Sequence, residues 1–384
     1  MFKVLPTNST QSMTYQQPIQ SEQGVSPRFD ANMQALREVV AGRFNHTNGF
    51  TGMGGLRNHL QAPQVRQELL ELLGQDGMAK LIESATSGYF TPPEVITYVY
   101  AILTRLGFDG GRILEPACGS GYFIEHMPEA IRDNSEITAI EPEPISAQIC
   151  AHEHPDIKVI NGGFEDYHGS GFDLIVGNPP YGSQVVCDSH HMDLKGQSIH
   201  HYFIAKAVRL LNNNGLCAMV VPAYVMDNIK NHARHYIAEH AELVCAYRLP
   251  DSLFADAKVT VDIIILRKTD NPDTSWTESV PIALDDGQRF HLSHYFANCP
   301  EHIIGQLDSY KVWMAKENRE RRGLKCTGSI ADVNAKLPVL INKLDRIIEA
   351  KPQSADDMKK ALAYLHKLAD QFNRCLSKMD TCIV

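Results

Sequence analysis

The stretch ILEPACGSGYF, residues 113–123, decides the fold class. A short apolar run ends on an acid, Glu115, and is followed by Gly119 and Gly121 in a turn that enters a helical pattern. Glycines let a ligand approach the backbone, and ligands bind at the strand ends of open α/β sheets. The stretch therefore predicts a strand, a glycine turn and a helix at the ligand-binding edge of an α/β sheet.

The sequence around this stretch alternates between helical patterns and short apolar strands. We expect helices at 92–107, 121–131, 145–154 and 201–215, and strands at 111–117, 136–143, 157–163, 172–178, 215–223, 242–250 and 259–268. Such alternation is typical of a mostly parallel sheet that is covered by helices on both faces.

A second acid marks the end of the next expected strand. Glu141 lies 20 residues after Gly121, and a carboxylate at this place accepts both hydroxyl protons of a ribose in doubly wound nucleoside sites. A dinucleotide site is the obvious competitor, but its fingerprint needs a third small residue where this chain has Ile124. The two acids around a glycine turn favour an adenosyl ligand.

The composition limits the class of protein. The 384 residues, 43% of them hydrophobic, can bury a large core and are typical of two domains. We expect a cytoplasmic protein with no membrane partner, because no apolar run approaches the roughly 20 residues that span a bilayer and the start lacks a signal peptide's apolar centre. The nine cysteines include no C-x-x-C pair and no recognised ligand spacing, which predicts reduced thiols and no metal.

The chain divides into four expected segments. Residues 1–27 read as a mobile arm, 28–87 as a helical extension, 88–270 as the α/β domain, and 271–384 as a mostly helical region that recognises DNA or binds a partner. In the last segment we expect an antiparallel pair of helices at 337–350 and 358–376.

The charge is unevenly distributed. The formal net charge of −9 argues against a surface coated for nucleic acid, but from residue 301 onward 15 Lys and Arg face 11 Asp and Glu. The densest basic stretch is KENRERRGLK, residues 316–325. It is either a solvated helix face or a surface for phosphate contacts, and its composition leaves both open.

A proline-rich tetrapeptide follows the fourth expected strand. GNPPYGS, residues 177–183, is in isolation a turn signal. Together with GYFTPPEV (88–95), LEPACGSGYF (114–123) and AIEPE (139–143), however, it resembles the class I S-adenosylmethionine-dependent N6-adenine DNA methyltransferases. The chain is most similar to the methylase module of the large methylase–helicase proteins of phages and conjugative elements, over about residues 45–268.

The resemblance implies a Rossmann-like, doubly wound, mostly parallel seven-stranded sheet and S-adenosylmethionine as cofactor. Thr91 would bind the methionine carboxylate, Glu115 and the glycine loop the amino group, and Glu141 the ribose. The full set of implied cofactor-binding residues is Tyr89, Phe90, Thr91, Glu115, Pro116, Ala117, Cys118, Gly119, Gly121, Glu141, Pro142, Phe164 and Asn178. The family usually places an acid before the aromatic at position 164, but this chain has Gly163, and either Glu165 or Asp166 could replace that acid.

The chemistry of adenine N6 methylation explains the tetrapeptide. The amine lone pair is delocalised into the ring, so two acceptors must draw on its protons: the side-chain oxygen of Asn178 and the carbonyl of Pro179. Pro180 and its neighbour stiffen the backbone, and Tyr181 offers a face for an extruded base. The resemblance implies that Phe254 supports the other side of that base. The chain has no Pro-Cys dipeptide of the kind that cytosine C5 methylation usually uses.

Three alternatives stay open at this point. The same tetrapeptide serves methylation of RNA adenine and of a protein glutamine amide, and the chain could be a cofactor-binding subunit that is inactive without a DNA-recognition partner. We expect duplex DNA with base flipping as the main partner, and a recognition subunit or a second copy as a further one. The resemblance also suggests restriction–modification or mobile-element biology.

Overall fold

A computed structural model describes most of the chain. The described residues are 2–4, 19–20, 29–45, 47, 50, 59, 62–87, 90–182, 184–254, 257–314 and 319–348. Residues 1–345 form one compact unit and residues 346–384 a second. The second helix of the pair expected near the C-terminus, 358–376, lies outside the described residues, as does most of the expected arm.

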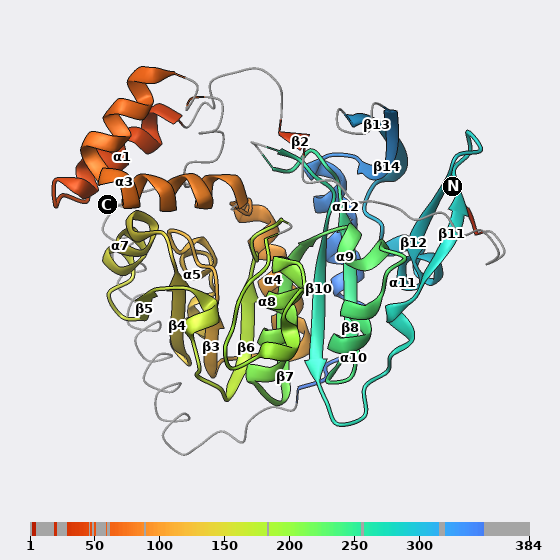
Figure 1. The fold of residues 1–384 in the computed structure, drawn as a ribbon. Helices are drawn as coiled ribbons and strands as arrows, with labels where there is room; N and C mark the ends of the chain where they lie inside the picture. Colours follow the sequence, from red (N-terminus) through yellow and green to blue (C-terminus); the bar gives the residue numbers. More distant parts are fainter. Residues whose placement is uncertain are drawn as a thin grey trace, which may run out of the picture. The chain divides into compact units, whose positions relative to one another are not determined.

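The centre of the first unit is a seven-stranded sheet in the order β5-β4-β3-β6-β7-β10-β8 (Figure 1). Its strands are β3 (Arg112–Glu115), β4 (Glu136–Glu141), β5 (Lys158–Asn161), β6 (Phe172–Gly177), β7 (Leu211–Pro222), β8 (Ala241–Leu249) and β10 (Val261–Lys268). All pairs among β3 to β7 are parallel, and only β10 runs against its neighbours. The predicted doubly wound, mostly parallel, Rossmann-like sheet is confirmed.

Helices cover both faces of the sheet. In Figure 1, α8 (Ile199–Leu210) and α10 (His232–Ala238) lie on one face, and α4 (Pro93–Leu106) and α12 (Ile330–Ile341) on the other. On the α8 face, Leu114 and Ile175 of the sheet share a buried cluster with Ile204. Burying both faces explains the nearly continuous apolar runs of the strands. The shorter helices are α5 (Tyr122–Glu125), α6 (Glu129–Arg132), α7 (Pro144–Glu153), α9 (Tyr224–Asp227) and α11 (His294–Asn298).

The N-terminal extension packs on the edge of the sheet that carries β5. Its helices α1 (Phe29–Val40) and α3 (Pro63–Ser87), the latter kinked at Gly74, form a buried cluster with Ile145 and Ile149 of α7. The hydroxyl of Ser120, in the glycine loop, donates to the carbonyl of Phe50 at 2.7 Å. The extension therefore supports the loop expected to bind the cofactor.

Three expectations about helices differ from the structure. The helix expected at 201–215 ends, as α8, at Leu210, and residues 211–215 belong to β7. The helix expected at 121–131 is split into α5 and α6, because Pro128 has no N–H to continue the first helix. The region from residue 271 is not mostly helical where the structure describes it. It contains β11 (Ser279–Ala283), β12 (Arg289–Ser293), β13 (Gln306–Met314) and β14 (Arg319–Thr327), and the helix expected at 337–350 is α12, which begins at Ile330 and ends at Ile341.

Short pairings and turns complete the first unit. β1 (Lys3–Val4) pairs with β11, and β2 (Ile19–Gln20) with β9 (Ala257–Lys258). The 3-10 turns are η1 (Phe164–Asp166), η2 (Met192–Leu194), η3 (Ser275–Thr277) and η4 (Pro300–His302). Within the described ranges, no helix combines the length and hydrophobicity that a membrane crossing requires.

Candidate active site

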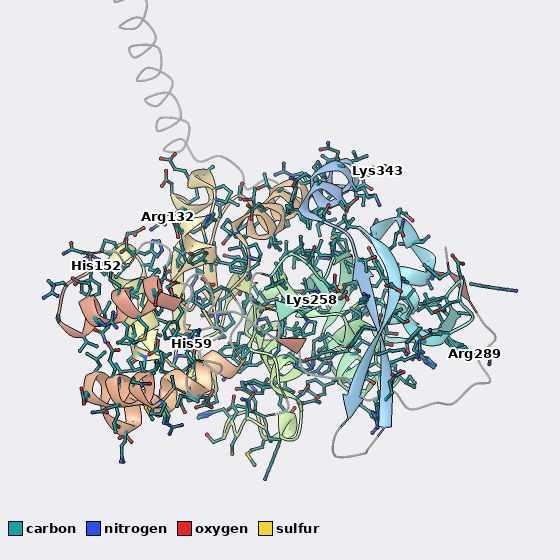
Figure 2. All side chains as sticks on the ribbon, turned by 90° about the horizontal axis from the view of Figure 1, so that it is seen from above. His59, Arg132, His152, Lys258, Arg289 and Lys343 are labelled. Carbon is teal, nitrogen blue, oxygen red and sulfur yellow. The ribbon has the colours of Figure 1, made fainter. Side chains whose placement is uncertain are left out.

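The predicted site residues meet at one edge of the sheet. Strand β3 lies between β4 and β6, and these parallel strands end at Glu115, Glu141 and Gly177. A Cβ atom at Gly177 would lie 3.5 Å from Cγ of Glu115, so the tetrapeptide that begins at Asn178 starts directly beside the first acid. Figure 2 shows the molecule from the side of this edge.

The glycine loop is shaped by positive φ angles. Gly119 has φ +55° and Gly121 has φ +94°, conformations that side chains other than glycine rarely adopt. A Cβ atom at Gly119 would also lie 3.1 Å from Cζ of Phe90, which packs edge-on to Tyr122. The FTPP segment and the glycine loop therefore fit together closely, which explains why both belong to one motif set.

Glu141 is held by two backbone N–H groups. Its carboxylate accepts from Gly119 N at 2.9 Å and from Glu143 N at 2.8 Å. Burial raises the pKa of Glu141 to about 7, although these two hydrogen bonds oppose the shift. Each carboxylate oxygen keeps a further acceptor site, so Glu141 can receive the two hydroxyl protons of a ribose.

Glu115 and Thr91 carry buried polar atoms that lack partners. Glu115 is 2% exposed, and neither its Oε2 nor the Thr91 hydroxyl has a hydrogen-bond partner among the described residues. Burial, followed by the nearby Cys150 and Glu141, raises the pKa of Glu115 well above its ordinary value. A buried acceptor and a buried donor without partners match the amino and carboxylate groups of a methionine, so the donor set fits S-adenosylmethionine.

The tetrapeptide is partly covered. Asn178 and Pro180 are half-buried, and Pro179 is buried. The Tyr181 hydroxyl donates to the carbonyl of Val220 at 3.2 Å, and its ring is 2% exposed. Phe254, which follows β8, is 5% exposed. Stacking of a base on either ring stays a prediction, and it requires a more open arrangement around the two rings, because both are buried.

Phe164 lies deeper than a stacking role suggests. Its ring is 1% exposed and packs 5.0 Å from Phe203 of α8, between centroids. The family usually has an acid at position 163, and here a Cβ atom at Gly163 would collide with the carboxylate of Glu165. Of the two acids considered from sequence, Glu165 therefore occupies the space beside Gly163.

The remaining predicted residues surround the loop. Pro116 and Cys118 are buried, Ala117 is half-buried, and Pro142 is exposed with its carbonyl accepting from Asn161 Nδ2 at 3.2 Å. Tyr89 lies outside the described residues. The roles of all these residues stay predictions.

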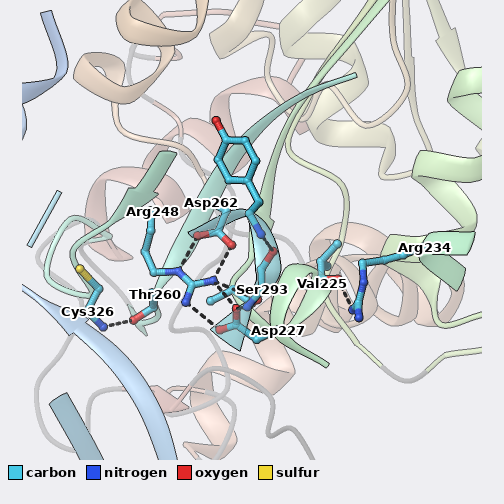
Figure 3. Close-up of polar contacts among 10 residues, drawn as sticks. Val225, Asp227, Arg234, Arg248, Thr260, Asp262, Ser293 and Cys326 are labelled. Atoms are coloured by element: carbon cyan, nitrogen blue, oxygen red, sulfur yellow. Dashed lines mark hydrogen bonds and ion pairs between the residues drawn. The ribbon is translucent and has the colours of Figure 1, made fainter. Parts of the chain in front are cut away.

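Two buried ion-pair groups were not found from the sequence. Lys206 Nζ contacts Asp188 at 2.7 Å and donates to the Phe164 carbonyl at 2.6 Å, which ties the loop after the tetrapeptide to the turn at residue 164. Arg248 lies between Asp227 and Asp262 (Figure 3). The sequence does contain a sign of both groups, because Arg248, Asp262 and Lys206 are charged residues that interrupt otherwise apolar runs.

Several known proteins are similar in sequence to the part of the chain that forms this site. Residues 117–253 match the Eco57I restriction-modification methylase family. Defense against restriction protein B of Escherichia phage P1 is 30% identical over 216 residues, which cover 53% of this chain and 9% of that protein. Type II methyltransferase M.CvrRI of Paramecium bursaria Chlorella virus XZ-6E is 28% identical over 47% of this chain and 48% of its own. These matches confirm the predicted resemblance to DNA methyltransferases and show that the similar proteins include restriction-modification methylases.

A third relative acts on another polymer. The tRNA1(Val) (adenine(37)-N6)-methyltransferase of Photorhabdus laumondii is 27% identical over 33% of this chain and 57% of its own length. The chain spans less than two thirds of each of these three relatives.

Proposed function

We propose that this chain transfers a methyl group from S-adenosylmethionine to the N6 amine of adenine in DNA. The observation that carries the proposal is the position of the Asn178 tetrapeptide directly beside Glu115 and the glycine loop. A site for an adenosyl cofactor and a pair of acceptors for an amine thereby share one sheet edge. The matches to restriction-modification enzymes support DNA as the polymer.

The cofactor would be held by residues of three motifs. When bound, it supplies an electrophilic methyl group on a sulfonium. Glu115 would accept from the amino group, the Thr91 hydroxyl would donate to the carboxylate, and Glu141 would accept from the ribose. Because burial raises the pKa of Glu115, a cationic amino group beside it would stabilise the charged carboxylate.

The target amine would be held by Asn178 and Pro179. The side-chain oxygen of Asn178 and the carbonyl of Pro179 accept the two amine protons, which returns the lone pair from the ring to nitrogen. The proton lost after transfer leaves to solvent or to a nearby carboxylate. Tyr181 and Phe254 would flank the extruded base once the segments that cover them have moved.

The partners are part of the same proposal. Duplex DNA is the substrate, in the cytoplasm, and a recognition subunit or a second copy of the chain would complete sequence selection. Methylation of RNA adenine or of protein glutamine instead of DNA would be an alternative outcome of the following test. The purified chain is incubated with tritiated cofactor and, separately, with duplex DNA, plasmid-derived RNA or a release factor; label found only in RNA or protein would overturn the proposal.

The Asn178→Ala variant tests the acceptor role. We expect methyl transfer to DNA to fall by at least about a hundredfold, since removal of one preorganised polar group costs 10²–10³ in rate. Cofactor affinity, measured by calorimetry, should stay within about twofold, because Asn178 acts on the target amine. The matched control is Asn213→Ala at the far end of β7, where the side chain is exposed. Equal loss of transfer and of cofactor binding would assign Asn178 to the cofactor instead.

A further inference from the structure

The basic stretch predicted at 316–325 belongs to a two-stranded ribbon. β13 and β14 pair antiparallel over nine positions, and no other strand joins them in the described part of the chain. Residues 319–325, considered above as a helix face, are therefore strand residues. A Cβ atom at Gly323 would collide with the ring of Tyr310 on the opposite strand, so this ring lies across the ribbon and stiffens it.

The base of this hairpin is fixed to the substrate end of the sheet. Ile304 N donates to the Arg248 carbonyl at 2.9 Å, where β8 ends, and Asp251 N donates to the Cys326 carbonyl at 2.8 Å. Cys326 N donates to Thr260 Oγ1 at 2.9 Å, just before β10 begins (Figure 3). An isolated two-stranded ribbon is marginally stable, and these three bonds supply the support.

Arg248 makes this anchor rigid. Its guanidinium bonds Asp262 from Nε at 2.9 Å and Asp227 from Nη1 at 2.7 Å, and Asp227 also accepts from Ser293 N at 2.9 Å. All three charged side chains are buried. The hairpin therefore leaves the body from a fixed point rather than from a loose linker.

The hairpin lies beside the proposed base site. Phe254 is in the segment between the two anchoring positions Asp251 and Thr260, and Lys258 in the same segment is exposed near the centre of this face (Figure 2). In Figure 1 the blue hairpin stands on the side of the sheet where β3, β4 and β6 end. A polymer that delivers a base to Asn178 would therefore pass on the side of the sheet where this ribbon stands.

The ribbon is rich in positive charge, whereas the chain as a whole is negative. Residues 306–327 contain six Lys or Arg and three Asp or Glu, whereas the whole chain has a net charge of −9. Lys311 and Arg322 stand directly opposite each other, 58% and 40% exposed, and Glu320 lies near both, at 3.3 and 3.8 Å. Like charges in opposite positions destabilise a strand pair. Glu320 offsets part of that cost, and a phosphate beside both cations would offset more.

We propose that the β13–β14 hairpin is an arm that enters the major groove of the DNA duplex. The inference rests on the proposed function and names the surface by which the duplex is held. The major groove of B-form DNA, about 12 Å wide, admits a two-stranded ribbon. The deep, narrow major groove of A-form RNA does not, so the shape of the arm selects DNA. Lys311 and Arg322 contact phosphates and set the position of the ribbon.

Charge removal on the arm tests the proposal. The full chain and its Lys311→Gln/Arg322→Gln variant are titrated with a fluorescent B-form duplex at salt concentrations of about 50 to 300 mM. We expect binding to weaken by about tenfold or more near physiological salt, and the slope of log K against log salt to fall by about 2, one per lost phosphate contact. The Lys311→Arg/Arg322→Lys variant should restore both.

The matched control lies at the opposite end of the sheet. Lys158 begins β5 and Lys343 follows α12, beside Asn342, whose carbonyl accepts from Arg105 near the end of α4; both lysines are exposed. Lys158→Gln/Lys343→Gln removes the same charge but should leave the salt slope within about 0.5 of the parent, since neither contacts phosphate in the proposed complex. If the two double variants weaken DNA binding equally, net charge alone explains the loss, and the proposal is overturned.

A second measurement tests the groove. A duplex whose major groove is filled by glucosylated hydroxymethylcytosine should bind the parent several-fold more weakly and bind the arm variant as its plain counterpart does. No difference for the parent would contradict major-groove entry. These measurements distinguish failure of the arm proposal from failure of the proposed function. If the parent protein binds duplex through the arm but transfers no methyl group to DNA, adenine methylation alone is disproved. If the parent protein methylates DNA and the arm variant binds duplex equally well, the arm alone is disproved.

Discussion

Two groups of buried polar and charged residues lie at the same sheet edge, and they differ in whether their polar atoms have hydrogen-bond partners. Around Arg248, both carboxylates of Asp227 and Asp262 accept hydrogen bonds from the guanidinium. Around the glycine loop, Glu115 Oε2 and the Thr91 hydroxyl have no partner within the described ranges. The first group is complete without a ligand, and the second is not.

This difference separates support from binding. Buried polar groups in folded proteins are nearly always hydrogen-bonded, so each exception needs an explanation, and at Glu115 and Thr91 a bound cofactor would supply one. A saturated ion-pair group contributes to the folded structure, and breaking it leaves a buried charge uncompensated. We therefore expect substitutions in the Arg248 group to reduce stability, and substitutions in the Glu115 group to reduce cofactor binding.

The largest expected effect is on the Arg248 group. Arg248→Met leaves two buried carboxylates facing each other, and loss of one partner of a buried pair costs about 3–5 kcal/mol. Burial already raises the pKa of Asp262 to about 6 against the opposing effect of Arg248. Without the guanidinium that pKa rises further, so the folded state holds a proton that the unfolded state releases, and the stability deficit should grow as pH rises.

Urea unfolding of the two proteins at several pH values measures this deficit. Arg267→Met is the matched control, because Arg267 pairs with Glu242 at a partly exposed position, where an ion pair is worth about 0–1 kcal/mol. If both variants lose the same small amount of unfolding free energy, the Arg248 group does not stabilise the fold as proposed.

The Glu115→Gln variant addresses the other group. Because a buried carboxylate hydrogen-bonded to a charged group is worth about 1.5–3 kcal/mol, we expect cofactor affinity to fall by roughly ten- to a hundredfold. The free energy of unfolding in the absence of cofactor should not fall, since burial disfavours the charged form of Glu115.

Calorimetric titration with S-adenosylhomocysteine, which keeps the amino group, gives the affinity, and urea unfolding gives the stability. Glu143→Gln provides a nearby contrast: Glu143 is also buried, but its carboxylate accepts from Ile145 N and Ser146 N and caps α7. That variant should lose stability more than affinity. A stable Glu115→Gln protein with unchanged affinity would remove Glu115 from the cofactor site.

Local patterns in the sequence were sufficient for the strands and the loop but not for the region after residue 270. The ends of β3, β4 and β6 could be located because apolar runs, glycines and acids are local signals. The ribbon could not, because RERRGLK has no alternation of apolar and polar residues, and its strand conformation depends on Tyr310 packing across Gly323. The burial of Phe164 and Tyr181 likewise depends on α8 and β7, which are distant in sequence.

The smallest expected effect concerns pH and Glu141. Burial raises the pKa of Glu141 to about 7, and accepting ribose hydroxyl protons favours its charged form, so cofactor binding releases a proton below that pH. Cofactor affinity should therefore rise with pH through 7 and level off above it, by about tenfold between pH 6 and pH 8. Calorimetry in buffers of different ionisation enthalpy measures both the affinity and the proton release. The Glu141→Gln variant should bind more weakly at pH 8 and show a flat profile, and a pH dependence that survives in that variant would assign the titration to Glu115 instead.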